Sequence, residues 1–189
     1  MRSSFGKVAL LMGACVLARL GAWAEAPASP DLAITYDASR ANIVPGNNFW
    51  MQGGSVQIHD QFWRGLGVVA DIAGLHTGNV HGTGVGLSLV TATFGPRYTW
   101  SFAHQRYSLF GQVLAGEANG FDSVFPTATG TESSADGLAI EVGGGMNVPL
   151  SGHLAVRAFE ADWLRTQLPN GSTGVQNSLR VGAGFIFKF

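Results

Sequence analysis

Apolar and polar residues alternate along most of the chain beyond residue 30, and this period limits the possible folds. In the final stretch, VGAGFIFKF, the side chains of Phe185, Phe187 and Phe189 share one face, and Lys188 lies on the other. Successive side chains point to opposite faces of a β-strand, whereas a helical pattern repeats every 3.6 residues. Amphipathic helix patterns are missing throughout this sequence. We therefore expect an all-β protein.

Eight segments with this period can be drawn. They span residues 31–39, 50–59, 62–74, 85–101, 106–117, 136–149, 153–166 and 176–189. In the seventh, LAVRAFEADWL, Arg157 and the pair Glu160 and Asp162 fall on opposite faces unless one residue is inserted between them. We therefore predict a β-bulge near Ala158 and Phe159.

The connections between these segments alternate between short and long. Only DQ, FAHQ and LSGH separate segments two and three, four and five, and six and seven. The other gaps are longer, and the longest runs from Glu117 to about Asp136. Short turns at one end and long loops at the other are typical of outer-membrane barrels.

Two eight-stranded barrels fit the period, and they differ in which face is apolar. A soluble ligand-binding barrel has an apolar lumen, whereas a membrane barrel has an apolar outer face. Aromatic residues near the segment ends favour the membrane barrel because they resemble the aromatic girdles at bilayer interfaces; they are Phe62 or Trp63, Tyr98, Trp100, Tyr107, Trp163 and Phe189. The opposite faces mix small residues with charges of both signs, namely Asp37, Asp71, Arg97, Glu141, Arg157, Glu160, Asp162, Arg180 and Lys188.

This pattern, together with GPRYTW, VRAFEADWL and the terminal FIFKF, resembles the eight-stranded outer-membrane β-barrel superfamily of Gram-negative bacteria, which includes the OmpA barrel domain and OmpX. The resemblance implies an antiparallel up-and-down transmembrane β-barrel located in the outer membrane, in contact with outer-membrane lipid and lipopolysaccharide. In that superfamily the terminal aromatic residue is read by the barrel-assembly machinery, so Phe189 is expected to address the chain to it.

The N-terminal region reads as an export signal. Arg2 and Lys7 precede the apolar run from Val8 to Val16, and small residues follow at Ala24 and Ala26. We expect a signal peptide over residues 1–24, cleaved after Ala24 or Ala26, and a barrel domain over 25–189. Cys15 lies inside this leader, so the mature chain has no thiol; MGAC is also a weak match to a lipoprotein box, which would make Cys15 a lipidation site.

The mature chain carries no cluster of basic residues. Cleavage after Ala24 leaves eight basic and twelve acidic residues, so nucleic acid is not an expected partner. The acids of the longest loop are Glu117, Asp122, Glu132 and Asp136, and their irregular spacing favours solvation over a cation site.

Barrels of this size include outer-leaflet lipid enzymes, which need a nucleophile or base positioned by a neighbour. His59, His104 and His153 lie beside the short turns, where a polar turn or interface role is expected. His76 and His81 lie in the second long loop, where Asp71 or a serine can approach them, but no motif surrounds them. We expect no catalytic residue, cofactor or metal, and keep a lipid A acyltransferase or deacylase as the alternative function and a ligand-binding lumen as the third.

The inward charges should form networks, because buried charges are costly unless they are paired. We predict that Arg180 and Arg157 join Glu141, Glu160 and Asp162, whereas Arg97 reaches Asp37 or Asp71. The lumen of an eight-stranded barrel is only wide enough for its own side chains. The expected function is therefore that of a non-enzymatic envelope or surface-contact protein with a closed lumen, and not that of a general porin.

Overall fold

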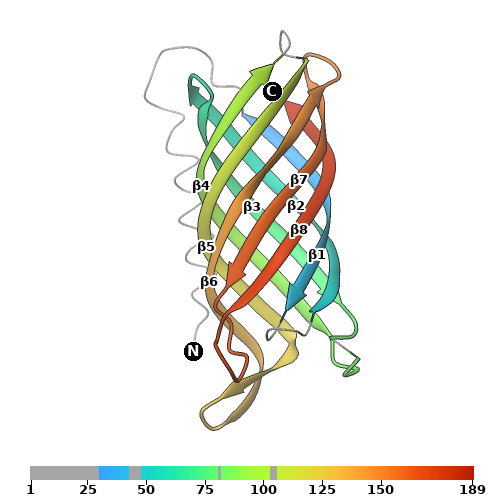
Figure 1. The fold of residues 1–189 in the computed structure, drawn as a ribbon, viewed down its shortest axis with the longest axis vertical. Coiled ribbons are helices and arrows are strands. Elements are labelled where there is room, and N and C mark those ends of the chain that lie inside the picture. Colours follow the sequence, from blue (N-terminus) through green and yellow to red (C-terminus); the bar gives the residue numbers. More distant parts are fainter. Residues whose placement is uncertain (1–29, 43–47, 81, 103–105) are drawn as a thin grey trace.

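The computed structural model describes residues 30–42, 48–80, 82–102 and 106–189, and in them eight antiparallel strands form a closed barrel (Figure 1). The strands are β1 (Asp31–Asn42), β2 (Asn48–Trp63), β3 (Leu66–Thr77), β4 (Leu87–Phe102), β5 (Tyr107–Thr127), β6 (Gly130–Pro149), β7 (Leu154–Thr166) and β8 (Gln176–Lys188). The predicted leader, with Cys15, lies outside the described residues. In the part of the chain that is described, no helix is long and apolar enough to cross a membrane.

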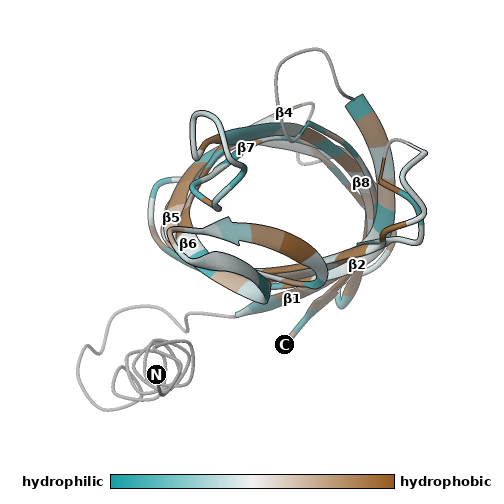
Figure 2. Cartoon of the chain, turned by 90° about the horizontal axis from the view of Figure 1, so that it is seen from below, coloured by the Kyte–Doolittle hydropathy of each residue, from teal (hydrophilic) through white to brown (hydrophobic). Residues whose placement is uncertain are grey.

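Each strand pairs with its neighbours in the sequence, and the first and last strands close the ring. Asp31 pairs with His59 of β2 on one side and with Lys188 of β8 on the other. Viewed along the barrel, the strands enclose a single lumen (Figure 2). The prediction of an eight-stranded up-and-down barrel is confirmed.

The bulge predicted in the seventh segment is also confirmed. Met146 pairs with Phe159 and the next residue, Asn147, pairs with Arg157, so Ala158 is the extra residue of β7. The ladder with β8 shifts between Arg157 and Glu160. Both of these charged side chains are buried in the lumen as a result.

The turn between β2 and β3 differs from the prediction. Asp60 and Gln61 were expected to form it, but they continue the ladder opposite Val68 and Gly67. The turn is formed instead by Arg64 and Gly65, whose φ angles are 37° and 94°. Two-residue hairpin turns favour positive φ at both central positions because this matches the twist of the strands.

The longest predicted loop is mostly a hairpin. β5 continues to Thr127 and β6 begins at Gly130, so only two residues connect them at the outermost turn. Backbone hydrogen bonds maintain this ladder, and beyond the membrane neither face requires a continuous apolar surface. The residues after Glu117, although their alternation is weak, therefore form a β-ribbon, which extends beyond the barrel at the bottom of Figure 1.

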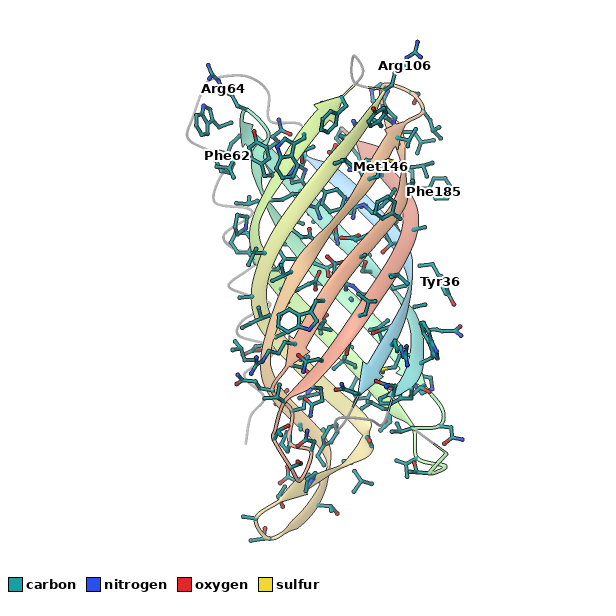
Figure 3. The ribbon with its side chains drawn as sticks, viewed as in Figure 1. Tyr36, Phe62, Arg64, Arg106, Met146 and Phe185 are labelled. Atoms are coloured by element: carbon teal, nitrogen blue, oxygen red, sulfur yellow. The ribbon has the colours of Figure 1, made fainter. Side chains whose placement is uncertain are left out.

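The outward face of the barrel is apolar and aromatic. Tyr36, Phe62 and Phe185 project away from the barrel in Figure 3, and each is more than half exposed. The aromatic residues expected at the bilayer interfaces are exposed too, including Trp63, Tyr98, Trp100, Tyr107, Trp163 and Phe189. The charges expected on the opposite face are buried, apart from the half-buried Lys188. The membrane barrel is thus confirmed over the soluble barrel with an apolar lumen.

Candidate functional site: the barrel lumen

A cluster around Arg180 occupies the middle of the lumen. The Nη2 atom of Arg180 lies 2.6 Å from Glu141, 2.9 Å from Asp71 and 3.5 Å from Asp162. These four residues, the Arg180 cluster, come from β8, β6, β3 and β7, and all four are buried. A guanidinium with several carboxylate partners offsets much of the desolvation that each charge loses on burial.

A second cluster lies nearer the short turns, and its centre is Glu160. Arg157 Nη1 lies 2.8 Å from Glu160, and Arg97 Nη2 lies 3.9 Å from it. The side chains of Gln57 and Gln112 each donate to Glu160 at 2.9 Å. We call Arg97, Arg157, Glu160, Gln57 and Gln112 the Glu160 cluster. Gln112 also donates to Asp162 at 3.0 Å, which joins the two clusters.

An aromatic ring supports both arginines of the Glu160 cluster. The guanidinium carbons of Arg97 and Arg157 lie 4.2 and 4.7 Å from the centre of the Phe110 ring. In the sequence Phe110 lies on the same side of the alternation as the polar Ser108 and Gln112, and it is buried in the lumen with them. Its position is explained by cation–π attraction, which strengthens when the cation is desolvated.

The predicted partners of Arg180, Arg157 and Glu160 are confirmed, but those of Arg97 are wrong. Arg97 donates to Gln57 and Gln112 and contacts neither Asp37 nor Asp71. Asp71 pairs with Arg180, and Asp37 accepts a hydrogen bond from Thr35 at 3.0 Å. Strand tilt and stagger bring residues from different heights in the sequence together, and counting from the turns did not include this shift.

The loop end of the lumen is filled by apolar side chains, which sequence reasoning missed. Met51 and Leu164 are fully buried there, and Phe125 and Leu168 pack against the same group. We call this group the outer apolar cluster; it also contains Ala41, Phe49, Leu75, Val80, Leu87, Leu89, Ala118 and Ala139. Leu164 shares a face with Glu160 and Asp162, and extending that face along the seventh segment would have identified it.

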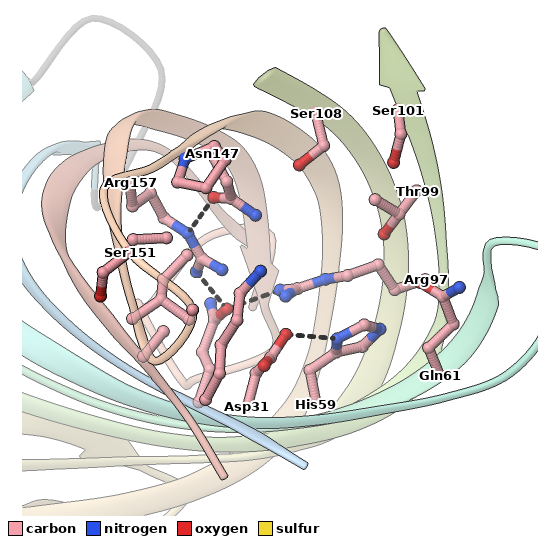
Figure 4. A pocket seen from close by; sticks show the side chains of 17 residues that line it. Asp31, His59, Gln61, Arg97, Thr99, Ser101, Ser108, Asn147, Ser151 and Arg157 are labelled. Carbon is pink, nitrogen blue, oxygen red and sulfur yellow. Dashed lines mark hydrogen bonds and ion pairs between the residues drawn. The ribbon is translucent and has the colours of Figure 1, made fainter. Parts of the chain in front are cut away.

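Two cavities flank this filled interior. The larger, about 350 Å³, lies between the Glu160 cluster and the short-turn end, where Figure 4 shows its lining side chains. The smaller, about 90 Å³, lies at the loop end beside Phe49, Phe125 and Leu168. The charged clusters and the outer apolar cluster separate the two cavities.

Glycines on β6 and β8 make room for buried carboxylates in the lumen. A Cβ on Gly143 would collide with the carboxylate of Asp162 and with the carbonyl oxygen of Ala161. In the same way, a Cβ on Gly182 would collide with the carboxylate of Asp37. A side chain at either position would therefore displace a buried charge.

The histidines lie in three different environments. The turn or interface role expected for His59 is wrong, because β2 continues past this residue to Trp63 and its side chain is buried in the lumen. The Nδ1 atom of His59 lies 3.7 Å from Asp31. His153 is exposed at a short turn, as expected, whereas His81 and His104 lie outside the described residues. His76, the second-last residue of β3, lies on the outer face, where its Nδ1 is 3.0 Å from Ser88 Oγ.

The approach of Asp71 to His76 does not occur, because Asp71 points into the lumen and pairs with Arg180. A serine does approach it, and Ser88 Oγ in turn donates to Asp122 at 3.1 Å. Asp122 has a positive φ of 58°, which is uncommon for a residue other than glycine. Ser88 thus lies between an imidazole and a carboxylate.

The acidic residues of the longest expected loop are spread along the β5–β6 hairpin. Asn119 donates to Asp136 at 2.5 Å, whereas Asp122 accepts from Ser88. Over the described ranges, no group of three or more His, Cys, Asp or Glu side chains is arranged to hold a metal ion.

Several solved structures have a fold similar to that of this chain. No protein-family model and no curated protein sequence matches the chain. Among solved structures, Neisserial surface protein A is similar with a TM-score of 0.65 and 10% identity over 85% of this chain and 97% of that one. The attachment invasion locus protein Ail of Yersinia pestis has a TM-score of 0.59 and 17% identity over 87% of this chain and 100% of that one.

The outer membrane protein OprG of Pseudomonas aeruginosa is similar as well, with a TM-score of 0.53 and 13% identity over 86% of this chain and 96% of that one. All three comparisons cover nearly the whole of the known barrel. A closed ring of strands with an apolar, aromatic outer face satisfies every backbone group within lipid. The chain therefore has the fold of the eight-stranded outer-membrane β-barrels, and its apolar, aromatic outer face fits a place in a membrane.

Proposed function

We propose that this protein is a non-enzymatic outer-membrane barrel with a closed lumen, which makes surface contacts through its external loops. The observation that carries the proposal is the contrast between the filled lumen and the long hairpin outside it. The charged clusters and the outer apolar cluster occupy the path that a solute would take. The hairpin, in turn, offers a structured surface beyond the membrane.

The free part of the hairpin begins where its neighbours stop. β4 pairs with β5 no farther than Phe121, and β7 pairs with β6 only from Ala139. Beyond these points β5 and β6 pair only with each other, as far as Thr127 and Gly130. Both outer edges of this ribbon present backbone groups to a partner, as the free edges of sheets do.

The charge of the hairpin indicates the partner's chemistry. Residues 118–138 contain Asp122, Glu132 and Asp136 and no lysine or arginine. Ail was solved in complex with a heparin analogue, sucrose octasulfate, which is a polyanion. An acidic ribbon repels such a ligand, so we expect a basic protein surface as the partner here.

Shortening the hairpin tests this function. In the shortened variant, an Asn-Gly turn joins Phe121 to Ser134, which removes the ribbon together with Phe125 of the outer apolar cluster and leaves the barrel ladders intact. The purified variant should fold but lose its retention on an immobilised lysine-rich peptide, whereas the full-length protein is retained at low salt. Equal retention of both proteins would overturn the proposed surface contact.

We also propose lipopolysaccharide as a lipid partner on the outer face. Arg40 of β1 and Arg165 of β7 share the outward face with Tyr36 and Trp163, respectively. Only β8 lies between their strands, so these two lines of residues are two strand spacings, about 10 Å, apart. Within the described residues, neither arginine forms an ion pair with an acid. Two free guanidiniums at the outer end suit phosphate groups.

Substitution of these arginines tests the lipid partner. The double variant Arg40→Gln, Arg165→Gln should bind purified lipopolysaccharide more weakly than the wild-type barrel in the same detergent. Arg106→Gln is the matched control, because Arg106 is exposed at the short-turn end of the barrel (Figure 3). Weakening by the control alone would contradict this assignment.

The barrel-assembly machinery is the third proposed partner, through Phe189. This residue is 72% exposed, and it directly follows the strand that closes the barrel against β1. An exposed aromatic side chain at the end of the closing strand is accessible to a receptor before the barrel closes.

One observation favours the alternative, an outer-leaflet lipid enzyme. Ser88 Oγ contacts His76 on the outer face, where a lipid acyl ester can approach. In nucleophilic triads, however, the carboxylate holds the imidazole, whereas here Asp122 accepts from Ser88 itself. Mass spectrometry of lipid A separates the two functions. An altered acyl pattern that disappears with Ser88→Ala or His76→Ala would refute the non-enzymatic function.

A further inference from the structure

The larger cavity has the dimensions of a small-molecule site. Its volume of about 350 Å³ falls at the lower end of the range of ligand pockets, about 300–1,000 Å³. Every strand except β3 contributes to its wall, and the short turn at Ser151 and Gly152 lines its periplasmic side. A small solute in this cavity would therefore be surrounded by protein on most sides.

The lining of the cavity is cationic. Arg97 and Arg157 form its inner wall and Lys188 also lines it, whereas Asp31 is the single carboxylate residue among the lining residues (Figure 4). Asp31 lies beside His59, 3.7 Å from its Nδ1. Glu160 lies behind the wall and is shared by both arginines. The inner wall thus carries two guanidiniums that share one carboxylate, and the other acids of the clusters, Asp71, Glu141 and Asp162, lie farther in, around Arg180.

The two arginines keep donors for a ligand. Arg97 uses Nε and Nη2 for its hydrogen bonds, and Arg157 uses Nε and Nη1. Arg97 Nη1 and Arg157 Nη2 therefore have no partner among the described residues. Unlike Arg180 Nη1, they are not sealed from solvent, and both residues line the cavity. The wall thus holds two guanidinium NH2 groups without a partner among the described residues.

His59 also lines the cavity, and its Nε2 atom lies beside Gly67 of β3, a strand that does not line it. His59 Nε2 is buried and has no hydrogen-bond partner among the described residues. Gly67 leaves room for it, because a Cβ at that position would lie 2.6 Å from Nε2. The remaining wall is rich in hydroxyl and amide groups, from Gln57, Gln61, Thr99, Ser101, Ser108 and Asn147. Such groups accept or donate as a polar ligand requires.

We propose that this cavity is a periplasm-facing binding site for a small phosphate, either inorganic phosphate or a short phosphate ester. Two guanidinium donors and an ammonium group suit the tetrahedral oxygens of phosphate. The outer apolar cluster closes the other end of the lumen, so the ligand enters and leaves from the periplasm. This site is independent of the surface contacts proposed for the hairpin.

Titration calorimetry of the refolded barrel tests the site. The probe is inorganic phosphate at low ionic strength, and maltoside micelles exclude phosphate headgroups from the sample. We expect saturable binding of one phosphate per barrel. Lys188→Gln should weaken it about fivefold, because it removes one cation from the lining without breaking the Glu160 cluster.

The matched control is Arg106→Gln. Arg106 is a basic residue at the same end of the barrel, but it does not line the cavity. Phosphate binding should be unchanged in this variant. The proposal would be overturned if no heat of binding were measured, or if the heat did not saturate as phosphate is added. Equal weakening by Lys188→Gln and Arg106→Gln would overturn it as well. A short phosphate ester, glycerol phosphate, distinguishes the two ligands by its relative affinity.

Discussion

Arg180 of β8 and Glu141 of β6 lie 2.6 Å apart in the middle of the lumen, although 39 positions separate them in the sequence. The two strands are not neighbours in the barrel, so this ion pair runs across the inner side of β7, which lies between them. Together with Asp71 on β3, Arg180 connects opposite walls of the barrel. The Arg180 cluster therefore ties together strands that share no backbone hydrogen bonds.

Removing Arg180 should destabilise the barrel strongly. Arg180→Ala leaves three buried carboxylates without their cation, and breaking a buried ion pair in this way costs about 3–5 kcal/mol when the site is dry. Urea unfolding of the refolded protein in micelles measures the loss. Arg40→Ala, on the exposed outer face, should cost less than about 1 kcal/mol. Similar losses for both variants would show that the Arg180 cluster is not a dry network.

A methyl group on Gly143 should also disturb the clusters. Gly143→Ala places a Cβ against the Asp162 carboxylate and the Ala161 carbonyl, and overpacking of this kind costs about 1–3 kcal/mol. Gly74→Ala is the control, because a Cβ on Gly74 meets nothing within 4 Å. The fraction of heat-modifiable, folded barrel after refolding should fall for Gly143→Ala alone. A fall for Gly74→Ala alone would contradict the packing role.

Deletion of Phe189 should impair assembly in cells. If the assembly machinery reads this residue, the deletion lowers the amount of folded, heat-modifiable protein in outer-membrane fractions. Lys188→Gln serves as the control, because the side chain of Lys188 forms no ion pair among the described residues. Equal folded yields of the two variants would count against a role of Phe189 as an address.

The purified protein should not form a large, stable channel. The charged clusters and the outer apolar cluster lie across the lumen between the two cavities, so a hydrated ion finds no continuous path. Single-channel recording in a planar bilayer checks this expectation. A conductance as stable and as large as that of a general porin would refute the closed lumen.

The sequence by itself determined the number of strands, the bulge at Ala158 and the face on which each charge lies, because all three follow from a period of two residues. It also placed Arg157, Arg180 and their acids in one interior. The period does not give the level of a side chain along the barrel axis. For this reason the prediction paired Arg97 with Asp37 or Asp71 rather than with Gln57 and Gln112.

Only the tertiary structure decided which inward side chains meet, how far the β5–β6 hairpin extends, and where the lumen stays open. Strand tilt and stagger set the contacts among Arg180, Asp71 and Glu141, and they arise when the sheet closes on itself. The hairpin beyond Phe121 is held by backbone hydrogen bonds, which any sequence can form. The cavity beside Arg97 and Arg157 forms where several lining side chains are small, including Ala33, Thr99, Ser101, Ser108 and Ala155, and its volume is a property of the closed ring rather than of any one strand.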